Sequence, residues 1–122
     1  MSDVNEPVER YMAAWNETGA ETRRTLVAQV FAEDVTYTDP LVAVQGRDSL
    51  DATIAAVQGQ FKGLTFSLGA PVDAHHDIAR FTWHLGAEGA DPIVIGFDVA
   101  VIGDDGRISQ VLGFLDRVPA GA

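Results

Sequence analysis

One acidic residue stands in the most apolar segment of the chain. Asp98 is the only ionisable residue between Ile93 and Ile102. A buried carboxylate there is costly unless it is hydrogen-bonded, paired or protonated. Burial also raises the pKa of a carboxyl group, and a protonated carboxyl group can donate a hydrogen bond. The position therefore indicates either a functional acid or a carboxyl group held by a structural hydrogen bond, and both interpretations stay open.

A second carboxylate and three aromatic side chains are further candidates. Asp39 precedes Pro40, and an Asp-Pro pair often simply begins a turn. Tyr11 and Trp15 share one helix face, where aromatic residues usually belong to the core. Tyr37 is a similar case on a short predicted strand. A buried tyrosine hydroxyl needs a hydrogen-bond partner, which makes Tyr11 a more interesting candidate than Trp15.

The sequence carries no metal or cofactor signature. There is no cysteine, and the three histidines lack the spacing of convergent ligands. His75 and His76 stand in what reads as a polar hairpin turn, and His84 shares the polar face of a strand with Arg80. Dinucleotide, phosphate-loop and nucleophile-elbow motifs do not occur. We expect neither a metal nor a cofactor, and nucleotide-dependent enzymes and serine hydrolases are disfavoured.

The elements that must position these residues are three helices followed by strands. Apolar periodicity predicts helices from Glu6 to about residue 18, over 21–32 and over 47–61. Alternating or apolar runs predict strands over 35–38, 64–70, 78–86, 93–102 and 107–118. Short connections between the later strands favour an antiparallel sheet. Helices first and strands afterwards predict an α+β fold with the helices on one face of the sheet.

The strand predicted over 93–102 is apolar on both faces. One face carries Phe97, Val99 and Val101, and the other carries Asp98 among small and apolar residues. Such a pattern indicates that both faces are covered. Because the helices can cover only one face, we expect a homodimer formed through Phe97, Val99 and Val101.

The bulk properties exclude other classes of protein. A chain of 122 residues with 47% hydrophobic residues has the size and balance of a single domain over 1–122. A net charge of −10 disfavours phosphate backbones and anionic membranes as partners. The chain lacks a run of 18 apolar residues, and its N-terminus is polar and acidic. We expect no nucleic-acid or membrane partner and a cytoplasmic location.

The order of elements and three short motifs together resemble the cone-shaped nuclear transport factor 2-like fold. The motifs are the segment 31–40, the Gly-Arg-Asp at 46–48, and Asp98 placed eight residues before the Gly-Arg-Ile at 106–108. The resemblance covers nearly the whole chain and implies three N-terminal helices packed on a curved antiparallel sheet. Its superfamily includes ketosteroid isomerases, SnoaL-type polyketide cyclases and limonene epoxide hydrolases.

Within that superfamily, the pattern is most similar to the ketosteroid isomerases. The resemblance implies Asp39 as a general base and Asp98 as a protonated acid that binds the substrate oxygen. Tyr11 would be the second donor, with Trp15 as the alternative at that position. The substrate would be a small apolar ketone, steroid-like or polyketide-like, and no cofactor would be needed. The side chains expected around it are Trp15, Tyr37, Phe61, Trp83, Val111 and Leu115, with Gly96, Ala100 and Gly113 on the same face.

Three other functions stay open for such a chain. A polyketide cyclase of the SnoaL type would also use an aspartate as acid and base. An epoxide hydrolase would need Arg80 between two carboxylates around a water molecule. A binding or dimerisation module without catalysis is the third, because a fold does not specify its function. Such a module is expected to fill the pocket with its own aromatic side chains.

Overall fold

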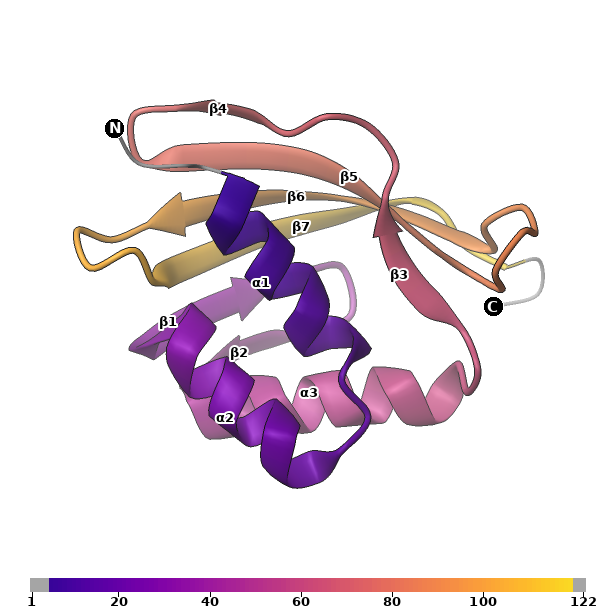
Figure 1. Cartoon of the computed structure of the whole chain (residues 1–122), viewed down its shortest axis with the longest axis horizontal. Helices are drawn as coiled ribbons and strands as arrows, with labels where there is room; N and C mark the ends of the chain where they lie inside the picture. Colours follow the sequence, from indigo (N-terminus) through magenta and orange to yellow (C-terminus); the bar gives the residue numbers. More distant parts are fainter. Residues whose placement is uncertain (1–4, 120–122) are drawn as a thin grey trace.

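The computed structural model describes residues 5–119, and the expected α+β fold is confirmed (Figure 1). The helices are α1 (Asn5–Asn16), α2 (Ala20–Val30) and α3 (Arg47–Gln60). The strands are β1 (Phe31–Thr38), β2 (Ala43–Gln45), β3 (Thr65–Leu68), β4 (Asp73–His75), β5 (Ile78–Gly86), β6 (Val94–Ile102) and β7 (Ile108–Arg117).

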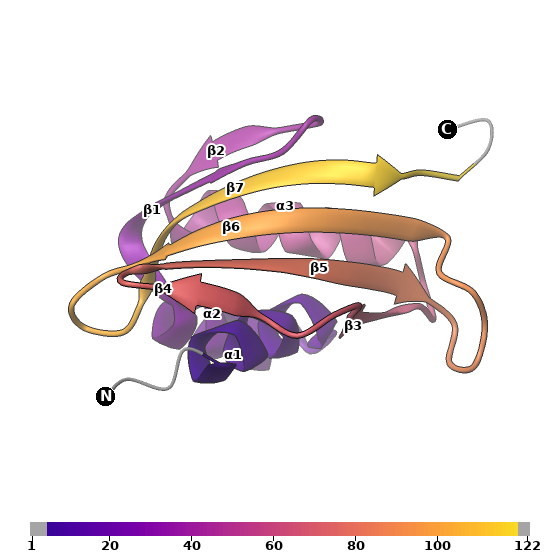
Figure 2. The ribbon, with the colours of Figure 1, turned by 90° about the horizontal axis from the view of Figure 1, so that it is seen from above.

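The strands form one curved sheet, and the three helices lie against a single face of it (Figure 2). The strand order is β2-β1-β7-β6-β5-β3, and β4 pairs with β5 outside that path. Every pairing is antiparallel except β1 with β7, which is parallel. These two strands are far apart in the sequence, so no tight hairpin forces them to be antiparallel. The sheet is therefore mostly antiparallel, as expected, with one parallel pair beside the site.

Two short strands and one helix end differ from the prediction. The second helix ends at Val30, and Phe31 already has an extended backbone with φ −111° and ψ 145°. Strand β1 therefore begins four residues earlier than predicted. Strands β2 and β4 have three residues each, too few to show an alternation in the sequence. The segment expected as a plain turn around His75 thus contains β4, which pairs with β5.

The end of α1 is anchored to the other two helices by a polar cluster. Arg23 of α2 is buried, and its Nε lies 2.8 Å from Oδ1 of Asp51 on α3. Gln58 of α3 accepts a hydrogen bond of 3.0 Å from Arg23 and donates bonds of 2.8 Å to the backbone oxygens of Trp15 and Glu17. Because these partners span three helices, the cluster fixes where Trp15 stands relative to the sheet.

The outer face of the sheet carries no helix (Figure 2). Phe97, Val99 and Val101 are half-buried there. On the neighbouring strand β7, Leu112 is 38% exposed and Phe114 is 58% exposed. This face is where we expect the homodimer to form, and that expectation stays a prediction. Among the described residues, no helix has the length and apolar character needed to cross a membrane.

Candidate active site

A cavity of about 410 Å³ lies between the helices and the inner face of the sheet. Its wall combines α1, α3 and the ends of five strands. It is mostly apolar, and Asp39 and Asp98 are its two carboxylates. The bordering residues are Tyr11, Met12, Trp15, Tyr37, Asp39, Pro40, Leu41, Val57, Gln60, Phe61, Phe66, Trp83, Leu85, Val94, Asp98, Leu115, Val118 and Pro119.

Asp98 is held inside this cavity by Tyr11. Strand alternation turns Asp98 inward from β6, where it is 2% exposed. The hydroxyl group of Tyr11, on α1, donates a hydrogen bond of 2.7 Å to Oδ2 of Asp98. The Tyr11 ring is itself fixed by edge contacts with Phe31 and Phe81, at centroid distances of 5.7 and 5.3 Å. The carboxyl group thus accepts its hydrogen bond from a rigidly held hydroxyl group.

The environment of Asp98 raises its pKa from an ordinary value of 3.8 to about 6. Burial is the largest cause, since a carboxylate loses hydration inside an apolar cavity. The hydroxyl of Tyr11 and the indole of Trp83 oppose the shift, and the negative charge of Asp39 adds to it. Burial and the Asp98 charge also raise the pKa of Tyr11 well above 10, so Tyr11 is a neutral donor.

Asp39 begins a turn and lines the cavity at the same time. Its Oδ1 accepts backbone hydrogen bonds of 2.8 Å from Leu41 and 3.0 Å from Val42. Its Oδ2 accepts a bond of 2.8 Å from the hydroxyl of Tyr37. Burial and the charges of both aspartates raise the pKa of Tyr37, which therefore stays protonated. Asp39 can therefore both stabilise the turn through Oδ1 and serve as a site residue that lines the cavity.

The role of Tyr37 as the partner of Asp39 was not anticipated from the sequence. The sequence predicts Tyr37 as part of the pocket wall and as a tyrosine whose hydroxyl needs a partner if it is buried, but it does not name that partner. The signal available is the spacing of two residues between Tyr37 in β1 and Asp39, which directly follows its last residue Thr38, because residues two apart in an extended chain point to the same face. The site therefore contains two Tyr–Asp pairs, Tyr11 with Asp98 and Tyr37 with Asp39.

Gly113 separates the two carboxylates. On β7 it pairs with Asp98 of β6, while its neighbour Leu112 pairs with Thr38 of β1. A Cβ atom on Gly113 would lie 2.7 Å from Oδ1 of Asp98 and 3.4 Å from the Cβ of Asp39. A side chain at this position would require the carboxyl group of Asp98 to move. The register of β7 against both neighbours thus brings the two aspartates to opposite sides of one glycine.

Trp15 stands between the two tyrosines. Its ring centroid lies 6.1 Å from that of Tyr11 and 5.6 Å from that of Tyr37. Among the buried side-chain nitrogen and oxygen atoms that the structure describes, Nε1 of Trp15 alone has no hydrogen-bond partner. A buried donor without a partner costs about 1–3 kcal/mol. The indole N–H of Trp15 is thus an unpaired donor near both Tyr–Asp pairs. Of the two residues proposed as the second donor, Tyr11 and not Trp15 contacts Asp98.

Five of the six expected wall residues border the cavity, and one does not. Trp15, Tyr37, Phe61, Trp83 and Leu115 all line it. The sixth, Val111, points inward as predicted but is fully buried in the core.

Val111 does not line the cavity because it lies deeper in the cone. It pairs with Ala100 of β6 and with Tyr37 of β1, in the part of the cone that the helices fill. Strand alternation gives the face of a residue but not its depth along the cone. The wall also includes Met12, Leu41 and Phe66, which the sequence did not single out.

Arg80 and His84 lie outside the cavity wall. Arg80 is exposed and pairs with Asp73, at 2.9 Å between Nε and Oδ2. The imidazole of His84 packs over Gly69, where a Cβ atom would lie 2.4 Å from its Nε2. The arrangement required of an epoxide hydrolase, an arginine between two carboxylates, is therefore not formed by Arg80. Within residues 5–119, no cluster of three or more metal-ligating side chains occurs.

Comparison with known proteins identifies the family. The model of the SnoaL-like domain matches residues 8–111. The chain belongs to the SnoaL-like family. A solved structure from Agrobacterium tumefaciens strain C58, described as a "putative isomerase of the SnoaL-like family", is 39% identical. The alignment covers 92% of this chain and 96% of that one, with a TM-score of 0.86.

More distant structures share the fold of this SnoaL-like chain. A "putative SnoaL-like polyketide cyclase" from Jannaschia sp. CCS1 is 18% identical, with a TM-score of 0.71 and coverage of 95% and 90%. An NTF2-like protein of unknown function from Cytophaga hutchinsonii is 10% identical, with a TM-score of 0.69 and coverage of 95% and 92%. The expected nuclear transport factor 2-like fold is thus confirmed. No curated protein matches the chain.

Proposed function

We propose that this protein is a cofactor-independent enzyme that moves a proton beside the carbonyl group of a small apolar ketone. The observation that supports it most is the pairing of two Tyr–Asp units across Gly113 in one apolar cavity. Proton transfer needs a base and an acid with separated pKa values, and electrostatic stabilisation of the oxygen that becomes negative. The two units can supply these groups without a metal.

In the isomerase form of this proposal, Asp39 is the base. It removes a proton from the carbon next to the carbonyl, and the electron pair moves onto the carbonyl oxygen to form an enolate. When the ligand binds, the hydroxyl group of Tyr11 turns its one proton from Asp98 to that oxygen, and protonated Asp98 donates a second hydrogen bond to it. Asp39 then returns the proton to the far carbon of the conjugated enolate, so the double bond shifts and the atoms balance.

Donation by Asp98 depends on the ligand. A pKa of about 6 leaves the protonated form at about a tenth of the population at pH 7. An apolar ligand that displaces water from the cavity increases the desolvation of Asp98 and raises its pKa further. We therefore expect ligand binding to take up a proton at neutral pH.

A cyclase-like role for Asp98 is the second candidate, and one observation favours it. The carboxyl group of Asp98 interacts with two side chains of the cavity wall, Tyr11 through the hydrogen bond to Oδ2 and Trp83 through its indole. Asp39, in contrast, accepts two of its three hydrogen bonds from the backbone of its own turn. A carboxyl group with a pKa near 6 among cavity side chains suits an acid–base role at neutral pH. In this form Asp98 itself takes the proton from the substrate and returns it, and the hydrogen bond from Tyr11 orients the Asp98 carboxyl group.

Turnover of a β,γ-unsaturated ketone, followed by the absorbance of the conjugated product, tests the proposal. The isomerase form predicts that Asp39→Asn lowers kcat about a hundredfold or more, and that Asp98→Asn costs less because an amide still donates. The cyclase-like form predicts the reverse order. Asp34→Asn, an exposed change on the same strand β1, is the matched control.

The competing interpretation is a module that binds without catalysis. It is supported if the wild type turns over no such ketone and Asp39→Asn alters neither ligand affinity nor stability. In that case the proposal of catalysis is wrong.

A further inference from the structure

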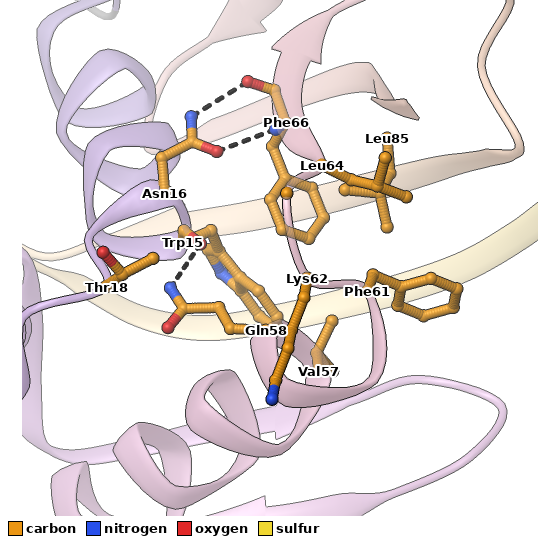
Figure 3. Close-up of a pocket in the computed structure, with 11 residues that line it drawn as sticks. Trp15, Asn16, Thr18, Val57, Gln58, Phe61, Lys62, Leu64, Phe66 and Leu85 are labelled. Carbon is orange, nitrogen blue, oxygen red and sulfur yellow. Dashed lines mark hydrogen bonds between the residues drawn. The ribbon is translucent and has the colours of Figure 1, made fainter. Parts of the chain in front are cut away.

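A second, smaller cavity of about 120 Å³ adjoins the first (Figure 3). It opens between the end of α1, the end of α3 and strand β3. Both cavities share five bordering side chains, which are Trp15, Val57, Phe61, Phe66 and Leu85. The candidate active site and this cavity are therefore neighbours that meet along the same apolar side chains.

Most polar side chains around the second cavity already have partners. The amide of Asn16 exchanges two hydrogen bonds with the backbone of Phe66, at 2.9 and 2.7 Å. Gln58 donates to the backbone oxygens of Trp15 and Glu17 and accepts from Arg23 (Figure 3). These groups are not free to recognise a ligand.

Lys62 and Thr18 are the remaining polar side chains of this wall, and both are exposed. Figure 3 shows Lys62 beside Val57 and Gln58 in this wall. An ammonium group and a hydroxyl group are both hydrogen-bond donors. Of the two, Lys62 carries the charge that attracts an anionic acceptor.

Lys62 is unusual in this chain. It is the only lysine, in a sequence with a net charge of −10. The ion pairs of the described residues involve Arg10, Arg23, Arg80 and Arg107, and none of them includes Lys62. Lys62 is therefore a positive charge at the edge of an apolar site, and it has no ionic partner within residues 5–119.

We propose that the ligand is an apolar ketone with a carboxylate tail, and that Lys62 binds the carboxylate at the second cavity. This inference rests on the proposed function, because the ketone occupies the first cavity. A single ammonium group matches a monoanion. A dianion such as a phosphate ester would meet stronger repulsion from a chain of net charge −10. The tail passes along the wall formed by Trp15 and Phe61.

Matched ligands with and without the charge test the inference. The probes are 6-hydroxynaphthalenes that carry an alkanoic acid of two to six methylene groups, and the methyl ester of each. The fluorescent hydroxynaphthalene ring imitates an enol in the first cavity. Affinities are measured by fluorescence titration for the wild type, for Lys62→Gln and for Arg80→Gln. Arg80 is an exposed cation outside both cavities, so this variant controls for the change in net charge.

We expect the wild type to bind one acid about two- to fivefold more tightly than its ester, the range typical of exposed ion pairs. Lys62→Gln removes this preference without weakening the ester, and Arg80→Gln preserves it. If the esters bind but no acid is preferred at any tether length, or the preference survives Lys62→Gln, the inference is wrong and the proposed function stands. If neither acid nor ester binds, both are wrong.

Discussion

The hydroxyl group of Tyr11 donates a hydrogen bond of 2.7 Å to Asp98, which lies 87 residues later in the chain. This bond joins the first helix to the central strand β6 inside an apolar cavity. It favours the charged form of Asp98, whereas burial favours the neutral form, and burial is the larger effect. The balance between these two effects places the pKa of Asp98 at about 6, where small changes in its surroundings alter its charge at neutral pH.

Removal of the Tyr11 hydroxyl should raise the pKa of Asp98 above 6. Tyr11→Phe deletes a donor that stabilises the carboxylate and keeps the ring between Phe31 and Phe81. The pKa is measured from the carboxyl ¹³C shift of Asp98 in a pH titration. Tyr37→Phe is the matched control, since Tyr37 donates to Asp39 instead. An Asp98 pKa that is unchanged or lower in Tyr11→Phe would contradict this role of the hydroxyl group.

The raised pKa of Asp98 should make folding stability depend on pH. The protonated form is favoured in the folded state, so this contribution is complete below pH 3.8 and is lost as pH rises through about 6. The shift corresponds to a loss on the order of 3 kcal/mol. Denaturant unfolding of wild type and Asp98→Asn between pH 4 and 7.5 measures it as the difference between the two proteins. The wild type should lose stability relative to the variant up to about pH 6 and no further above it; a difference that is constant with pH would count against the raised pKa.

A side chain at Gly113 should destabilise the folded protein. Gly113→Ala places a methyl group 2.7 Å from Oδ1 of Asp98, and we expect a loss of about 1–3 kcal/mol in the free energy of unfolding. Gly59→Ala on α3 is the control, because its Cβ would contact nothing within 4 Å and alanine is favoured by about 0.5–1 kcal/mol in a helix. Chemical denaturation of both variants decides the matter. Equal stability of the two would show that the space between the aspartates is not tight.

The outer face of the sheet should form the homodimer. Phe114→Glu introduces a charge beside Phe97 and Leu112, and it should convert a micromolar dimer into a monomer. Leu68→Glu, at an exposed position on β3 near the sheet edge, should leave the dimer intact. Sedimentation velocity of the three proteins measures the effect. A wild type that sediments as a monomer would refute the prediction.

Much of the fold and the inward direction of Asp98 could be predicted from the sequence. Alternation along β6 places Gly96, Asp98 and Ala100 on one face, and all three are buried as expected. A lone carboxyl group on such a face must have a raised pKa or a partner, and the structure shows both. These properties depend on local pattern and on burial, which the sequence encodes directly.

The contacts that each of the two aspartates makes with its neighbours could not be predicted in the same way. The Tyr37–Asp39 bond depends on the turn that connects β1 to β2, and β2 is too short to leave a pattern. The approach of both aspartates to Gly113 depends on a parallel pairing between strands from opposite ends of the chain. Such register comes from packing of the whole sheet, so residue types alone do not indicate it.

Hydrogen exchange on a model ketone tests the central proposal most directly. 2-Tetralone, an apolar bicyclic ketone, is incubated in D₂O with the protein, and proton NMR follows the loss of the hydrogens beside its carbonyl group. The wild type should exchange them about a hundredfold or more faster than an equal concentration of the Asp39→Asn/Asp98→Asn double variant. Equal rates for the wild type, the double variant and buffer would contradict proton transfer by these two residues.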